Sequence, residues 1–179
     1  MKKIMFNDKY RLTQAVLEGR KTQTRRILLP HTVRELRNGN DYQGVIRLYS
    51  KYKVGEVVAV AQRYKDIALD VPVELAAELI KQPGWTNKMF TKADILTHHI
   101  RITKIRIERL QDISEEDCLA EGIVDFESRI NKAHFYSITD ESATYGTAKK
   151  PYSLLIDKIA GKGTWASNPY VFVYEFELI

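Results

Sequence analysis

The stretch Tyr170-Val171-Phe172-Val173-Tyr174-Glu175-Phe176-Glu177-Leu178 decides the fold, because it alternates as a β-strand requires. Successive side chains of a strand point to opposite faces of its sheet. The five large residues at even positions share one face, whereas two valines and then two glutamates occupy the other. This pattern predicts a long final strand with one fully apolar face.

A second strand is expected over residues 98–110, with an irregularity near its middle. Ile100 and Ile102 share one face, but Ile105 and Ile107 have the opposite parity. A slip of one residue turns every later side chain to the other face, so we expect a β-bulge near residues 103–104. Strongly bent strands of small barrels use such bulges.

The remaining chain predicts short strands with helices between them. Strands are expected over residues 3–6 and 57–61, and helices over residues 9–18, 72–81, 114–121 and 151–160. Residues 28–50 read as irregular, and residues 125–150 as a polar insertion without clear periodicity. We therefore expect one α+β domain over residues 1–179, built around a small curved sheet or barrel with flanking helices.

The most cationic segment is Gly19-Arg20-Lys21-Thr22-Gln23-Thr24-Arg25-Arg26. It places four cations and three small polar side chains in eight residues, and it contains no large apolar residue for a core. Asp8 is the expected N-cap of the preceding helix, and Gly19 is the expected residue that ends it. A loop of this composition is suited to meet an anion, and its lysine and threonines are also capable of chemistry.

Positive charge is concentrated in the first third of the chain. The net charge is +5, but residues 1–63 carry a balance of +9 and residues 64–179 a balance of −4. An uneven distribution of this kind favours a polyanionic partner, so RNA, a nucleotide or a modified nucleoside is the expected ligand. The alternative is a solvated surface with chance clustering of charge.

Several classes of protein are disfavoured by composition. Cys118 is the single cysteine, which excludes an intramolecular disulfide, and the four histidines lack ligand spacing, so we expect no metal and no cofactor. No apolar run is long enough to cross a bilayer, and Asn7 and Asp8 interrupt any apolar signal region. A cytoplasmic protein without membrane contact is expected, and no protein partner is specified.

The order of the segments resembles the ASCH domain family, a branch of the PUA-like β-barrels, and above all its longer phage and prophage members. Four segments carry the resemblance in the expected order, namely Met5-Phe6-Asn7 with the basic segment, Tyr52-Lys53-Val54-Gly55-Glu56, residues 109–123 from Arg109 to Ile123, and residues 161–177 from Gly161 to Glu177. The resemblance implies a PUA-like barrel that holds RNA or a nucleotide in a cleft, with the basic segment as one wall.

The family pattern is Gly-x-Lys-x-x-Glu-x-Arg, and this chain matches it at Gly19, Lys21 and Arg26 but has Thr24 in place of the glutamate. Small ASCH proteins with threonine there resemble amidohydrolases that deacylate N4-acylated cytidine nucleosides through a lysine, a threonine and a later glutamate. The resemblance therefore implies Lys21, Thr24 and Glu121 as a catalytic set. Those hydrolases are much shorter than this chain.

Binding and catalysis remain alternative readings of the basic segment. In the first, Gly19, Arg20, Lys21, Thr22, Arg25 and Arg26 contact a phosphate or sugar; in the second, Thr24 attacks an acyl carbonyl with help from Lys21. Arg25 and Arg26 point to opposite sides of an extended segment, so one is expected to face the ligand and the other a carboxylate.

Two further alternatives involve residues far from the basic segment. Trp85 lies in a polar turn, where it either stacks on a base or covers the edge of the core. A phage-derived accessory protein that meets a protein partner through residues 125–150 is the third functional alternative.

Overall fold

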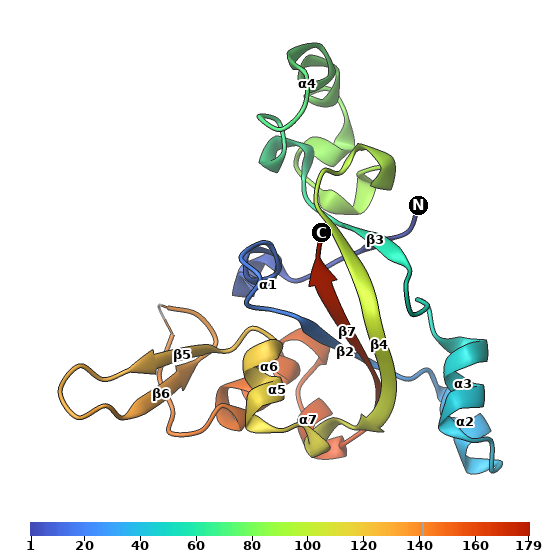
Figure 1. Cartoon of the computed structure of the whole chain (residues 1–179), viewed down its shortest axis with the longest axis vertical. Coiled ribbons are helices and arrows are strands. Elements are labelled where there is room, and N and C mark those ends of the chain that lie inside the picture. Colours follow the sequence, from blue (N-terminus) through green and yellow to red (C-terminus); the bar gives the residue numbers. More distant parts are fainter. Residues whose placement is uncertain (141) are drawn as a thin grey trace.

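The computed structural model describes residues 1–140 and 142–179. Its α+β architecture combines one five-stranded sheet with helices and a separate two-stranded hairpin (Figure 1). The strands are β1 (Lys3–Ile4), β2 (Gln23–Ile27), β3 (Val57–Val60), β4 (His99–Arg109), β5 (Val124–Glu127), β6 (His134–Ser137) and β7 (Tyr170–Leu178). The α+β class expected from the sequence is confirmed.

Two long antiparallel strands, β4 and β7, form the centre of the large sheet. The bounds of β7 are those that its alternation predicts, and the register of the pair shifts between Ile102 and Lys104, which confirms the expected bulge. Because of this extra residue, Ile100, Ile102, Ile105 and Ile107 are all buried despite their different parity.

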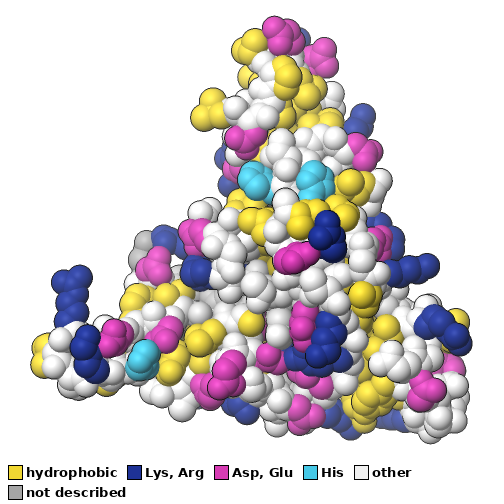
Figure 2. Space-filling model, in the orientation of Figure 1, with side chains coloured by type: hydrophobic (Ala, Val, Ile, Leu, Met, Phe, Trp, Pro, Cys, Tyr) yellow, Lys and Arg dark blue, Asp and Glu magenta, His cyan; other side chains and the backbone are white. Residues whose placement is uncertain are grey.

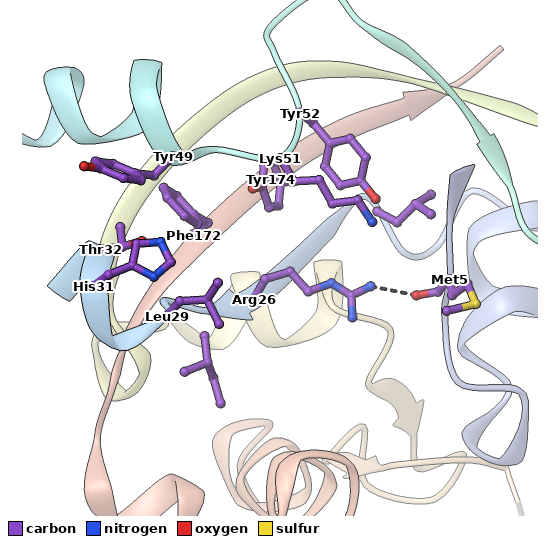
Figure 3. Close-up of a pocket in the computed structure, with 12 residues that line it drawn as sticks. Met5, Arg26, Leu29, His31, Thr32, Tyr49, Lys51, Tyr52, Phe172 and Tyr174 are labelled. Atoms are coloured by element: carbon purple, nitrogen blue, oxygen red, sulfur yellow. Dashed lines mark hydrogen bonds between the residues drawn. The ribbon is translucent and has the colours of Figure 1, made fainter. Parts of the chain in front are cut away.

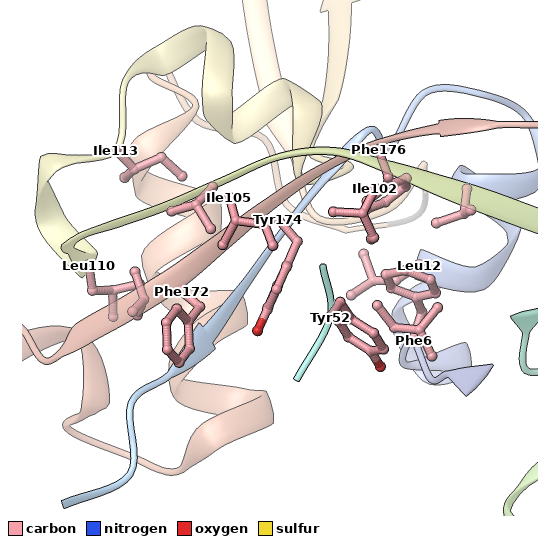
Figure 4. Close-up of a cluster of buried hydrophobic side chains, with 14 of the residues drawn as sticks. Phe6, Leu12, Tyr52, Ile102, Ile105, Leu110, Ile113, Phe172, Tyr174 and Phe176 are labelled. Atoms are coloured by element: carbon pink, nitrogen blue, oxygen red, sulfur yellow. The ribbon is translucent and has the colours of Figure 1, made fainter. Parts of the chain in front are cut away.

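The large sheet has the order β1-β3-β4-β7-β2. β1 pairs with β3 in parallel, and the other neighbours are antiparallel. Within the described residues, β1 and β2 are not paired with each other, so the sheet is open at these two edges rather than closed into a barrel. Its inner face carries a cluster of aromatic and branched side chains, including Phe6, Tyr52, Tyr174 and Phe176 (Figure 4).

The N-terminal helix begins later than the sequence indicates. Residues Asp8–Tyr10 form a 3-10 turn that Asn7 caps, Arg11 then adopts a left-handed backbone, and helix α1 spans Leu12–Leu17. Gly19 ends this region with a φ of 72°, as expected from a glycine at that position. The chain can therefore turn directly from α1 into β2.

The expectation of an irregular segment over residues 28–50 was wrong. This segment forms two helices, α2 (Pro30–Arg37) and α3 (Tyr42–Tyr49), joined by a short link around Asn38 and Gly39. Pro30 occupies the first turn of α2, where its missing N–H is no loss, and the Asp41 carboxylate caps α3 by accepting from Gly44 N at 2.6 Å. Turn-forming residues in the link obscured the helices on either side.

The connection between β3 and β4 forms an outlying lobe, which we define as residues 62–98. It contains α4 (Val73–Leu79), within the helix expected over residues 72–81, and it protrudes from the sheet (Figure 1). A second apolar cluster, separate from the main core, holds it together around Tyr64, Ile67 and Leu79. Trp85 packs against this cluster.

Residues 125–150 are more ordered than the sequence indicates, although residue 141 lies outside the described chain. β5 and β6 form an antiparallel hairpin that extends from the body of the molecule (Figure 1). The alternation in these strands was too short to be recognised in a polar segment.

Three helices between β4 and β7 complete the fold. They are α5 (Glu115–Ala120), α6 (Lys149–Ala160) and α7 (Thr164–Ser167). The Ser114 hydroxyl caps α5 by accepting from Asp117 N at 3.0 Å, as its sequence pattern predicts. None of the helices in the described residues is long and apolar enough to span a membrane.

Gly84 provides a test of the outlying lobe. A Cβ atom at Gly84 would lie 2.5 Å from Cε2 of the buried Tyr64 ring, so Gly84→Ala forces the lobe to repack. We expect a cost of about 1–3 kcal/mol that is confined to this lobe. Limited proteolysis should show faster cleavage within residues 62–98 and unchanged cleavage elsewhere.

The matched control is Gly146→Ala, because a Cβ atom there meets nothing within 4 Å. Equal proteolysis of the two variants, or cleavage of the main core in Gly84→Ala, would show that the lobe is not a separately packed unit.

Candidate functional site

A cavity of about 380 Å³ lies where the N-terminal segment, β2, α6 and the end of α5 meet. We call it the Thr24 cavity. Lys21, Thr24 and Glu121, the three residues of the expected catalytic set, all line it. The other lining residues are Met5, Phe6, Asn7, Asp8, Leu12, Arg25, Arg26, Lys88, Tyr152, Leu155, Ile156 and Ile159.

Two turns position Lys21 and Glu121 opposite each other. After Gly19, Lys21 N donates to Ala15 O at 2.9 Å, which fixes the entry to β2. Glu121 is the C-cap of α5, and Gly122 follows it with a φ of 102°. A Cβ atom at Gly122 would contact Lys21 Cβ at 3.6 Å, so a glycine suits both the backbone and the packing there.

Lys21 and Glu121 form a buried ion pair. Lys21 Nζ donates to Glu121 Oε2 at 2.5 Å and to the Glu121 carbonyl oxygen at 2.8 Å. The two residues are only 2% and 5% exposed. Burial, aided by the charges of Arg26 and Arg25, lowers the pKa of Lys21 despite the opposing effect of Glu121. The amine is therefore easier to deprotonate than that of an exposed lysine.

Thr24 lies on β2 beside this ion pair. It pairs with Tyr174 of β7, and its side chain is buried at the cavity wall. In the structure as described, no hydrogen bond joins its hydroxyl to Lys21 Nζ. Catalytic hydrogen bonds are often long before substrate binds, so shared access to one cavity is the relevant observation.

The two arginines that follow Thr24 have different surroundings. Arg26 is exposed, and its Nη2 donates to the Met5 carbonyl oxygen at 2.7 Å. The Arg25 side chain is buried, and it forms ion pairs with Glu108 at 2.7 Å, Asp117 at 2.6 Å and Glu121 at 3.2 Å. This confirms the expectation that one arginine pairs with a carboxylate, and it identifies that arginine as Arg25.

The charged network around Arg25 extends across the sheet. Arg106 on β4 also contacts Glu108, Asp117 and Glu175. Burial acts to lower the pKa of Arg25, but the charges of Glu121 and Glu108 outweigh it and keep the guanidinium protonated. Glu121 is consequently held from two sides, by Arg25 and by Lys21.

Several residues of the expected binding set lie outside the cavity. Gly19, Arg20 and Thr22 do not line it, and Arg20 forms a surface ion pair with Glu18 at 2.8 Å. Trp85 packs in the outlying lobe and is likewise not brought to the cavity. On the face seen in Figure 2, cationic and anionic side chains alternate rather than gather into one basic field.

Two polar residues of the cavity were not anticipated. Lys88 reaches it from the outlying lobe, and its amine donates to Phe6 O and to Asp8 Oδ1. Tyr152 reaches it from α6, and its hydroxyl is buried without a hydrogen-bond partner in the described chain. Burial, followed by the charge of Glu121, raises the pKa of Tyr152. Neither residue belongs to a recognisable sequence pattern, because tertiary packing alone brings each to the cavity.

Asp117 provides a test of the network at low pH. Burial acts to raise its pKa, but hydrogen bonds from Arg25 and Gln23 and the charges of Arg25 and Arg106 outweigh it and lower the pKa. A lowered pKa in the folded state stabilises the protein above the unfolded pKa, about 3.9, and this contribution disappears as the pH falls through the folded value. We therefore expect stability to fall below about pH 4 and Asp117→Asn to flatten this dependence.

Urea unfolding of both proteins between about pH 6 and about pH 3 measures the effect. Asp70→Asn changes an exposed aspartate and is the control. Its free energy of unfolding should depend on pH with the same slope as that of the unaltered protein. An Asp117→Asn slope equal to that of the control would contradict the role given to Asp117.

Comparison with known proteins identifies one similar solved structure and no family. No family model matches the chain, and no curated protein matches it. The crystal structure of protein EF3133 from Enterococcus faecalis V583, described by the family model DUF984, aligns with a TM-score of 0.47 and 14% sequence identity. The alignment covers 100% of this chain and 80% of that chain.

Proposed function

We propose that this protein is an ASCH-like amidohydrolase that removes the acyl group from an N4-acylated cytidine nucleoside. The observation that carries the proposal is the convergence of Lys21, Thr24 and Glu121 on one cavity. These residues lie up to 100 positions apart in the chain, and the ASCH resemblance had grouped them without reference to a structure. A PUA-like fold belongs to the same proposal, with the five-stranded sheet β1-β3-β4-β7-β2 as its framework.

The Thr24 cavity suits a nucleoside in size and composition. Its volume of about 380 Å³ falls within the usual range for small-molecule sites, about 300–1,000 Å³. Leu155, Ile156 and Ile159 form an apolar wall from α6, and the Lys21–Glu121 pair supplies polar groups. This combination favours an aromatic ring with a polar substituent over a long flexible chain.

The Lys21–Glu121 contact provides a route for activating Thr24. Transfer of one proton from Lys21 to Glu121 across the 2.5 Å contact leaves a neutral amine and a protonated carboxyl. The neutral amine takes the proton of the Thr24 hydroxyl while Thr24 Oγ1 bonds to the acyl carbon. Glu121 then gives its proton to the departing exocyclic nitrogen, and the carbon–nitrogen bond breaks.

The second half of the reaction restores the enzyme. The first half leaves an acyl ester on Thr24, the released nucleoside and the original charges of Lys21 and Glu121. A water molecule attacks the ester carbon, the Thr24 oxygen recovers a proton, and the carboxylic acid departs. Arg25 holds Glu121 in place throughout through its 3.2 Å ion pair.

A binding module for RNA or a nucleotide, without catalysis, is the second candidate. Arg26 favours it, because this exposed cation at the cavity has no carboxylate partner among residues 1–140 and 142–179. Binding to RNA phosphates releases counterions, so affinity for RNA would fall steeply as salt is raised. An RNA affinity that is independent of salt would remove this candidate.

Thr24→Ala tests the catalytic proposal. It removes the nucleophile, so we expect the release of acetate from N4-acetylcytidine to fall by about 10³-fold or more. Thr24→Ser retains a hydroxyl and should keep measurable activity. The assay is the rate of acetate release at saturating substrate.

Thr22→Ala is the matched control, because Thr22 belongs to the same segment but is exposed and does not line the cavity. It should retain full activity. Equal rates for Thr24→Ala and Thr22→Ala would eliminate Thr24 as the nucleophile, and no acetate release by the unaltered protein would eliminate the activity.

A further inference from the structure

A second pocket lies beside the Thr24 cavity, on the other side of Arg26. We call it the Tyr49 pocket. It has a volume of about 300 Å³ and lies between β2, the α2–α3 segment and β7 (Figure 3). Met5 and Arg26 line both cavities, so the two are neighbours along one surface. The Tyr49 pocket plays no part in the reaction proposed above.

The floor of the Tyr49 pocket is made of fixed aromatic rings. Tyr52 and Tyr174 meet edge to face with centroids 5.2 Å apart, and Phe172 packs on Tyr174 at 6.0 Å. The tyrosine hydroxyls are already engaged, since Tyr52 donates to Lys3 O and Tyr174 bonds to Ser50 Oγ. The floor therefore presents ring surface rather than free hydroxyl groups, and its three rings are packed against one another.

The rim of the pocket adds two accessible rings. Tyr49 is 37% exposed, and it packs on His31 with centroids 5.6 Å apart (Figure 3). Met5 and Leu29, at 40% and 61% exposed, continue the apolar surface at the mouth. Large apolar and aromatic side chains that remain exposed around one concavity favour an occupant with a flat apolar face.

The same pocket carries positive charge without compensating carboxylates. Arg26 donates to the Met5 carbonyl oxygen and lies 5.9 Å from the Phe6 ring centroid, and Lys51 Nζ lies 5.3 Å from the Tyr52 ring centroid. Within the described part of the chain, neither cation forms an ion pair, and no acidic residue lines the pocket. Figure 3 shows both side chains on the same side of the pocket. An anionic group in their vicinity would be stabilised.

We propose that the Tyr49 pocket binds a nucleotide, with its base against the aromatic rings and its phosphate at Arg26 and Lys51. A nucleotide is the ligand class that joins a flat aromatic ring to an anion across a short sugar, as this pocket requires. Forked donors of Arg26 suit a phosphate, and Tyr49 offers a stacking surface.

The pocket also defines how a longer substrate would lie. Because Arg26 is shared, a nucleotide in the Tyr49 pocket is the immediate neighbour of a nucleoside in the Thr24 cavity. This extension rests on the proposed function, whereas nucleotide binding itself does not. The nucleotide is either a free monophosphate or one unit of an RNA chain, and both present the same chemistry to the pocket.

Binding of adenosine 5′-monophosphate, compared with adenosine, tests the proposal by isothermal titration calorimetry on the full chain. We expect the monophosphate to bind about tenfold or more tightly than the nucleoside, because its phosphate forms charge-assisted hydrogen bonds. Lys51→Gln should reduce this difference, because only Arg26 then remains to meet the phosphate, and Tyr49→Ala should weaken the binding of both ligands. A higher salt concentration should weaken the binding of the monophosphate but not that of adenosine.

Matched controls come from neighbouring residues of the same type. Lys53→Gln alters an exposed lysine two positions away, and Tyr42→Ala alters an exposed tyrosine of the same helix; neither residue lines the pocket. Both variants should bind like the unaltered protein. Equal affinities for adenosine and its monophosphate, or unchanged binding by Lys51→Gln, would overturn the proposal.

Two further measurements are needed. The first distinguishes RNA from free nucleotides as the ligand of the Tyr49 pocket, and the second distinguishes failure of the nucleotide pocket from failure of the catalytic proposal. Tighter binding of a cytidine–adenosine dinucleotide than of the monophosphate assigns the pocket to RNA, and equal binding assigns it to free nucleotides. Thr24→Ala should bind the monophosphate normally. Failure of deacetylation with retained monophosphate binding therefore removes only the catalytic proposal, and the reverse result removes only the nucleotide pocket.

Discussion

The buried guanidinium of Arg25 is the interaction on which the site depends. Its three partners come from two elements: Glu108 lies on β4, and Asp117 and Glu121 lie in and at the C-terminal end of α5. A buried charge is tolerable only with such partners, and removal of one member leaves the others uncompensated. The cluster therefore ties β2, β4 and α5 together through one buried charge.

Glu121 connects this cluster to the Thr24 cavity. Arg25 fixes one of its oxygens, and the other meets Lys21 at 2.5 Å. The lysine consequently experiences both burial, which favours its neutral form, and a carboxylate, which favours its charged form. In the reaction that we propose, this opposed pair is the one that exchanges a proton.

The sequence predicted elements where a single local signal was sufficient. β7 followed from alternation, the bulge in β4 from a change of parity, and α5 from the Ser114 cap. The prediction of elements was wrong where local signals conflicted. Turn-forming residues between α2 and α3 masked the pattern of two short helices, and the left-handed backbone of Arg11 delays the start of the first helix.

The candidate site could be predicted only in part from the sequence, because packing between distant elements assembles much of it. Local composition identified the basic segment, but it did not show which of its cations are buried. The family resemblance connected Glu121 to Lys21, whereas Tyr152 and Lys88 reach the cavity through packing between distant elements. The Tyr49 pocket has no signature in the sequence, because His31, Thr32 and Tyr49 reach it from two short helices in a segment whose composition predicts irregular structure.

The bulge in β4 has an electrostatic consequence beyond packing. Past the extra residue, Ile105 and Ile107 return to the core face. Arg106 and Glu108, which alternate with them, take the opposite face, where Arg106 meets Asp117 and Glu108 meets Arg25. One additional residue in β4 thus decides on which face of the sheet the charged side chains of Arg106 and Glu108 lie. The offset also decides whether Glu108 can pair with Arg25, the same arginine that holds Glu121.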